Sequence, residues 1–133
     1  IRAASVSGPR HVAFGGVVTI DRQALDKLRE IVGGEERDLI ELIDAFLGEA
    51  PDIVAALTAA HAASDLVAAR RAAHSLKSNA RDMGAIELAE ICVRLEALCA
   101  AGVLPDAAEV EAARLAFADA AGDLRAAYPA ASQ

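Results

Sequence analysis

Aromatic residues are scarce in this chain of 133 residues, at 3% of the total, and tryptophan is absent. Stretches of strict apolar–polar alternation are also nearly missing, whereas alanine supplies much of the 55% hydrophobic content. Alanine is the strongest helix former and fills the core of a sheet poorly. The composition therefore predicts an all-α fold, and the length predicts one domain.

A basic surface and stacking aromatic side chains, which are typical of nucleic-acid-binding proteins, are both missing. The formal net charge is −7. No apolar run approaches the roughly 18 to 20 residues that cross a bilayer, and no basic stretch followed by an apolar one forms a secretory signal. We expect no nucleic-acid partner, no membrane contact by this domain and a cytoplasmic location, within a parent protein whose membrane anchoring is left open.

The chain has only two cysteines, Cys92 and Cys99, which lie seven residues apart on one predicted helix. Their separation along the helix axis would be roughly 10.5 Å at 1.5 Å per residue. A disulfide requires Cα atoms within about 7 Å. Both cysteines are therefore expected to be free and buried, which suits a reducing compartment.

The order of helix signals predicts an up-down antiparallel four-helix bundle with an additional short N-terminal helix across one end. Glycine pairs or single glycines follow the apolar stripes and are expected to end the predicted helices. Helix starts are predicted at Thr19 or Asp21, at Asp65 and at Pro105, which would occupy the first helical position. Pro51 falls inside a long, kinked second helix. The predicted helices cover residues 21–32, 35–62, 65–83, 86–101 and 105–128, between a linker or expression remnant at 1–18 and a tail at 130–133.

The third predicted helix separates apolar from basic residues around a histidine. At about 100° per residue, one face carries small and apolar side chains, and the opposite face is polar: Arg70, Arg71, His74, Lys77, Ser78 and Arg81. Four of the thirteen basic residues of this acidic chain lie within 70–81. His74 is therefore expected to point into solvent between cations. Periodicity alone does not distinguish a functional histidine from an ordinary solvated face.

The residues around this histidine resemble the signature of the histidine phosphotransfer domain family. The string is Ala-His-Ser-Leu-Lys at 73–77, followed by a small residue and, after a short variable stretch, by Met83-Gly84-Ala85. The downstream pattern L-x-x-x-C-x-x-L-E is matched from Leu88 to Glu96, and an upstream F-L-x-x-A-P pattern is matched from Phe46 to Pro51. The resemblance covers about residues 20–128. Ser78 stands where many members have glycine.

The resemblance implies a phosphocarrier domain over residues 19–129. His74 would accept a phosphoryl group from a receiver-domain aspartate, hold it on Nε2 and pass it to another receiver aspartate. Lys77 would stabilise the phosphoryl group, while Arg70, Arg71, Ser75, Ser78 and Arg81 would dock the partner. No phosphate-binding loop or metal-ligand spacing is present, and neither His11 nor His61 pairs with His74. No cofactor is expected in the chain, and the receiver would supply Mg²⁺.

Three points stay open at this stage. One alternative is the phosphoacceptor domain of a chemotaxis-type histidine kinase, and another is a helical interaction domain that is never phosphorylated. The parent protein is interpreted as a hybrid sensor histidine kinase or a free-standing carrier, without kinase activity in this domain. A complete four-helix bundle needs no partner to close its core, so the domain is expected to be a monomer.

Overall fold

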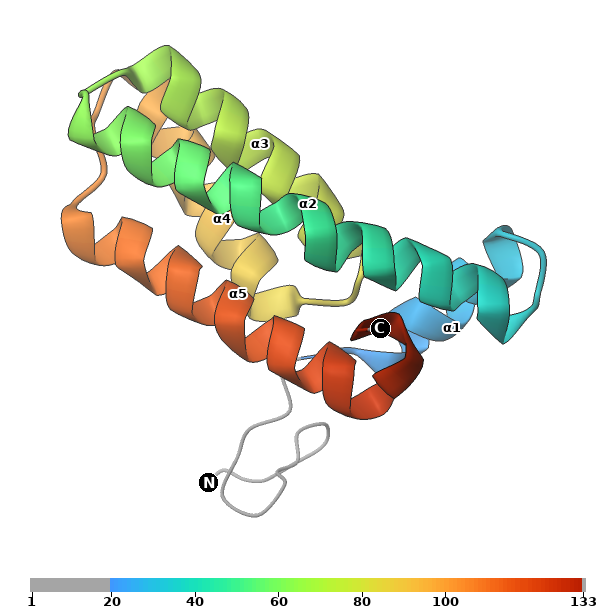
Figure 1. Cartoon of the computed structure of the whole chain (residues 1–133). Helices are drawn as coiled ribbons and strands as arrows, with labels where there is room; N and C mark the ends of the chain where they lie inside the picture. The colour runs from blue at the N-terminus through green and yellow to red at the C-terminus, as the bar shows by residue number, and fades with distance from the viewer. Residues whose placement is uncertain (1–19, 133) are drawn as a thin grey trace, which may run out of the picture.

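The computed structural model describes residues 20–132. Over these residues the chain forms five α-helices and a short 3₁₀ helix (Figure 1): α1 (Arg22–Ile31), α2 (Glu36–Ala62), α3 (Leu66–Asp82), α4 (Ile86–Ala100), α5 (Ala107–Ala127) and η1 (Pro129–Ser132). Helices α2 to α5 make the bundle, and α1 packs on α2 and α3 at one end of it. The predicted all-α bundle with an extra N-terminal helix is confirmed, whereas the predicted linker at 1–18 lies outside the described residues.

The helix starts follow the predicted capping residues in α1 and α3. The Asp21 carboxylate accepts a hydrogen bond from the Gln23 amide at 2.9 Å, and the Asp65 carboxylate accepts one from the Ala68 amide at 3.0 Å. Such caps satisfy amide groups that have no partner inside the helix. Helix α2 continues through Pro51 as one helix of 27 residues, as predicted.

The predicted role of Pro105 is wrong. Helix α5 begins after Asp106, which forms a capping box with Glu109, so the proline lies before the cap and not at the first helical position. The reciprocal bonds of a capping box satisfy two amides, whereas a first-turn proline satisfies none. The Pro105 carbonyl instead lies 2.8 Å from Nε2 of His61 at the end of α2. This contact ties α2 to the start of α5.

The core between the helices is built mainly from aliphatic residues and alanine. Leu39, Leu57, Leu76, Leu95 and Leu124 are almost completely buried, and no polar or charged residue of the described chain is fully buried. Both cysteines are buried and free, as predicted. The few aromatic rings join elements that are far apart in the sequence. Phe46 of α2 packs edge-on against Phe117 of α5, and the Arg22 guanidinium of α1 lies over the Tyr128 ring after α5.

The turn between α3 and α4 depends on Gly84. Its amide bonds to the Arg81 carbonyl and the Ala85 amide bonds to the Ala80 carbonyl, which is the Schellman pattern that ends many helices. Gly84 has φ +71°, a conformation that glycine adopts without the cost of a Cβ. Its carbonyl accepts a hydrogen bond from the Asp21 amide at 2.8 Å. The turn thereby holds the start of α1 against the end of α3.

Replacing Gly84 by alanine should destabilise the domain more than the same change at Gly102. Both glycines have positive φ, so each change carries the left-handed penalty of roughly 1–2 kcal/mol. A Cβ at Gly84 would also lie 2.6 Å from the Asp21 carbonyl oxygen, whereas one at Gly102 meets nothing within 4 Å. We expect Gly84→Ala to cost about 1–3 kcal/mol beyond Gly102→Ala, measured by urea unfolding. Equal costs would contradict this packing argument.

Candidate functional site

The predicted site histidine projects from the middle of α3. The side chain of His74 is 61% exposed, and Arg70, Arg71, Ser78 and Arg81 are exposed along the same helix. The opposite face, which includes Ala69, Ala73, Leu76 and Ala80, is buried in the core. The ring is therefore held on a rigid helix and open to solvent. This is the geometry that the 3.6-residue period predicts for position 74.

A carboxylate from α4 anchors the ring. Nδ1 of His74 lies 2.8 Å from Oε2 of Glu96, and Nζ of Lys77 lies 2.5 Å from the other oxygen, Oε1. Lys77 and Glu96 are mostly shielded from water, with 17% and 18% of their side chains exposed. One carboxylate thus joins the histidine and the lysine across the contact between α3 and α4.

The ionised state of Glu96 determines which ring nitrogen of His74 carries the proton. The hydrogen bond from Lys77 holds the pKa of Glu96 below its usual value of 4.5, and the hydrogen bond from His74 acts in the same direction. An ionised carboxylate only accepts hydrogen bonds, so Nδ1 of His74 must donate. In the neutral imidazole, Nε2 then has the free electron pair. No described residue makes a hydrogen bond to Nε2, and the His74 side chain is 61% exposed, so this nitrogen has no partner within the described part of the chain.

The cysteine nearest to this network does not compete as a nucleophile. Cys92 is buried one turn before Glu96. Burial, and to a smaller extent the negative charge of Glu96, raises the pKa of Cys92 to about 12. The thiolate is the reactive form of cysteine. Cys92 therefore remains a thiol at neutral pH and contributes to the core only.

Comparison with known proteins gives a family match and a similar solved structure. The profile of the Hpt domain family matches residues 41–130, which include His74, Lys77 and Glu96. The chain belongs to the Hpt domain family. It is similar in structure to histidine-containing phosphotransfer protein B of Pseudomonas aeruginosa PAO1, with a TM-score of 0.71 and 31% sequence identity over 86% of this chain and 90% of that chain. A search of curated protein sequences gives no match.

The predicted site residues of this Hpt domain do not all lie in one environment. His74 and Lys77 share one carboxylate, whereas the predicted docking residues Arg70, Arg71 and Arg81 extend along the exposed side of α3. Ser78 is exposed and Ser75 is half-buried. The sequence placed Lys77 on the polar face of its helix, and the structure pairs it with Glu96. Its ammonium group has three donors, so two remain after this pairing.

Glu96 is the site residue that sequence reasoning missed. It belongs to the downstream pattern that resembles the family, yet it was interpreted as part of that pattern and not as a partner of His74. The two residues are 22 positions apart and lie on different helices. Helix periodicity orders residues on one helix and says nothing about the rotation of its neighbour. The signal in the sequence that could have indicated this pairing is an acidic residue on the fourth predicted helix at the same height along the bundle as His74.

The described residues give no sign of a resident metal or a membrane span. No group of three or more histidine, cysteine, aspartate or glutamate side chains in residues 20–132 could hold a metal ion. Within the same residues, no helix is both long enough and apolar enough to cross a bilayer.

Glu96→Gln should destabilise the domain in a pH-dependent manner. We expect a loss of about 1–2 kcal/mol at pH 7, because the charged Lys77 loses its anionic partner in a partly buried position. The folded-state pKa of Glu96 is lowered, so its contribution is complete well above the unfolded value and disappears as the pH falls through the folded pKa. Urea unfolding of both proteins between pH 7 and pH 3 would measure this difference.

The difference between the two proteins should therefore narrow as the pH falls below 4.5, the ordinary value for glutamate. Glu111→Gln is the matched control, since Glu111 pairs with Arg114 on the exposed surface of α5. Ion pairs between exposed side chains contribute little to stability, so the control should unfold like the wild type at every pH. If the unfolding free energies of Glu96→Gln and the wild type differ by the same amount down to pH 3, the ionised carboxylate of Glu96 is not the cause of the difference.

Proposed function

We propose that His74 is the phosphoacceptor of this Hpt domain and that Nε2 is the attacking atom. One observation carries the proposal: Nδ1 is engaged by the Glu96 carboxylate while the ring remains 61% exposed. A nucleophile for another protein's phosphoryl group must be both oriented and reachable. Histidine held at one nitrogen and open at the other satisfies both requirements.

The proposed chemistry is a reversible transfer between His74 and receiver aspartates. Nε2 attacks the phosphorus of a phospho-aspartate, the N–P bond forms, and the P–O bond to the aspartate breaks, with the electron pair leaving on the carboxylate. The ring then carries positive charge, because Nδ1 keeps its proton while Nε2 bonds to phosphorus. The negative charge of Glu96 compensates for this positive charge. Transfer to a second receiver aspartate reverses these steps.

Lys77 is proposed to stabilise the phosphoryl group. It lies one helical turn from His74, and its bond to Glu96 leaves two ammonium donors for phosphoryl oxygens. Phosphoryl transfer depends mainly on positioning and on compensation of the oxygen charges. Glu96 would hold the ammonium near the reacting centre so that little rearrangement is needed. Lys77 and Glu96 thereby act on opposite partial charges of the same phosphohistidine.

The remaining expectations belong to the same proposal. Arg70, Arg71 and Arg81, with Ser75 and Ser78, would contact the receiver domain, whose Mg²⁺ would serve the transfer in trans. The domain would act as a monomer in the cytoplasm, without nucleic acid and without kinase activity of its own. A chemotaxis-type phosphoacceptor domain and an unphosphorylated interaction domain have less support, since the family match and the similar solved structure both concern phosphotransfer.

His74→Gln should abolish phosphorylation without unfolding the protein. The exposed ring makes its contact with Glu96 at the surface, so the helical circular dichroism spectrum should be retained. Incubation with a phosphorylated receiver domain, or with phosphoramidate as a small donor, should label the wild type with an acid-labile, alkali-stable phosphoryl group. His61→Gln is the control and should be labelled normally. Acid-labile label on His74→Gln would assign the phosphoacceptor to another residue.

Glu96→Leu should slow labelling by phosphoramidate, whereas Glu96→Gln should retain much of the rate. The glutamine oxygen still accepts a hydrogen bond from Nδ1, but leucine cannot. We expect the leucine variant to react roughly 10- to 100-fold more slowly, as when an orienting partner of other functional histidines is lost. The ¹⁵N chemical shifts of His74 would report the cause, since the Nδ1–H form should predominate in the wild type and decline in Glu96→Leu. Unchanged shifts together with a slow rate would contradict a positioning role.

A further inference from the structure

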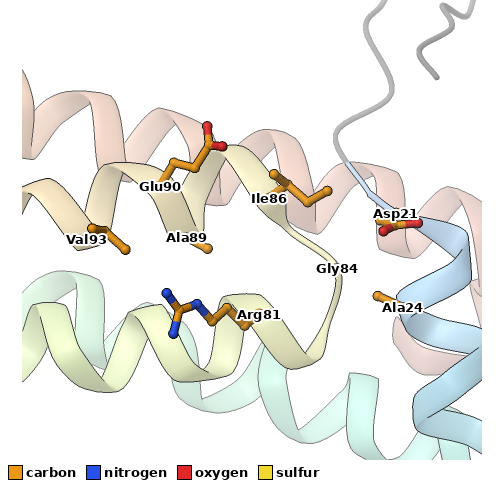
Figure 2. A pocket seen from close by; sticks show the side chains of 8 residues that line it. All are labelled: Asp21, Ala24, Arg81, Gly84, Ile86, Ala89, Glu90 and Val93. Carbon is orange, nitrogen blue, oxygen red and sulfur yellow. The ribbon is translucent and has the colours of Figure 1, made fainter. Parts of the chain in front are cut away.

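An apolar groove lies between α3 and α4 on the Gly84 side of His74, and Asp21 and Ala24 at the start of α1 complete its lining. The groove has a volume of about 260 Å³ and opens near the turn at Gly84 (Figure 2). Its walls include Ile86, Ala89 and Val93 of α4, and Arg81 of α3 lies across from Ala89 and Val93. Such concave apolar surface with a few polar groups at its edge is typical of binding sites.

The apolar walls of this groove are exposed to an unusual degree. Ile86 is 51% exposed and Val93 is 41% exposed, although the other large apolar residues of α4 are buried or half-buried. Arg81 and Glu90 place charges of opposite sign on the two sides of the groove. Protein interfaces commonly have an apolar centre that is surrounded by polar and charged residues.

The groove and His74 lie on the same face of the domain. Arg81 follows His74 by seven residues on α3, roughly 10.5 Å along the axis, and Ala89 precedes Glu96 by seven residues on the antiparallel α4. A stable interface covers about 800 Å² on each partner, a patch of roughly 16 Å radius. A partner footprint of this size that is centred on His74 therefore reaches the groove.

The other end of this face differs in shape and charge. Val67 precedes His74 by seven residues and is 67% exposed, with Arg70 and Arg71 between the two. A valine that stands out from a helix can be covered by a partner but does not enclose a partner's side chain. The two ends are equally distant from His74 along α3. Only the groove end can surround an apolar side chain of a partner on several sides.

We propose that the receiver domain that exchanges a phosphoryl group with His74 inserts an apolar side chain into this groove. Arg81 would pair with an acidic residue beside that side chain, and the Arg70–Arg71 end would contribute charge attraction without a buried anchor. The inference rests on the proposed function. The partner is a receiver domain and not a second copy of this chain, because His74 lies within the same footprint and must meet the aspartate of a receiver.

The test compares four aspartate variants for phosphotransfer from receivers. Purified receiver domains, phosphorylated with a small acyl phosphate, are screened for transfer to the wild type, and one that transfers is carried forward. Ile86→Asp and Val93→Asp alter the groove, Val67→Asp alters the opposite end, and Leu115→Asp is the matched control, since Leu115 is 50% exposed on α5. Phosphoramidate labelling of each variant measures the reactivity of His74 without a partner.

We expect the two groove variants to require at least about tenfold more receiver for half-maximal transfer, as when an interface anchor is lost. Their phosphoramidate rates should equal that of the wild type. Val67→Asp and Leu115→Asp should transfer within about twofold of the wild type, as surface positions outside an anchor do.

Four results would overturn the inference, the last of them together with the proposed function. Normal transfer by both groove variants, or a larger transfer defect in Val67→Asp than in Val93→Asp, would show that the receiver does not insert its anchor into the groove. A wild-type dimer that Val93→Asp converts to a monomer in light scattering would make the groove a contact between copies. Failure of the wild type to accept phosphate from phosphoramidate and from every receiver would instead refute the proposed function, and the docking inference with it.

Discussion

A single carboxylate holds the site together. Glu96 of α4 bonds to both His74 and Lys77 of α3, and two of these three side chains are mostly shielded from water. A charge that is withdrawn from water is costly unless it is paired. The network therefore favours one register and one rotation of α3 against α4. Any other alignment would leave Lys77 or Glu96 partly buried without its partner.

The same interaction reconciles two requirements that usually conflict. A nucleophile must be fixed in orientation, which favours burial, and it must be open to another protein, which favours exposure. In this domain, the ring is held at Nδ1 and not by enclosure. The fixed proton at Nδ1 also leaves the electron pair on the outer nitrogen, Nε2. The anchoring of the ring and the proposed reactivity of Nε2 thus depend on one hydrogen bond.

The sequence predicted what depends on a single helix. The starts at Asp21 and Asp65, the stops at Gly84 and Gly102, and the exposure of His74 each follow from residues within a few positions. Pro105 was assigned wrongly because two local signals competed, and the capping box that begins at Asp106 satisfies more amides than a first-turn proline. The sequence contains both signals, but it does not show which of them determines where the helix begins.

The features that were missed depend on how two helices pack. Glu96 is 22 residues from His74, and its role depends on the register of α4 against α3. Lys77 lies about 60° from His74 around the helix, a position at the border of the exposed face. Periodicity places such a residue near solvent, whereas the neighbouring helix covers it. The groove between Ile86, Val93 and Arg81 has the same origin, since its two walls belong to different helices.

The composition helps to explain why so short a side chain as glutamate can bridge these helices. Helices α3 and α4 pack against each other more extensively than any other pair in the described part of the chain. Their buried positions include several small residues: Ala69, Ala72, Ala73 and Ala80 on α3, and Ala89, Cys92 and Cys99 on α4. The distance between packed helices depends on the size of the side chains at their contact. The abundance of alanine and the scarcity of aromatic rings therefore contribute to the geometry of the proposed site, because small side chains allow α4 to lie close enough for Glu96 to reach His74 and Lys77 together.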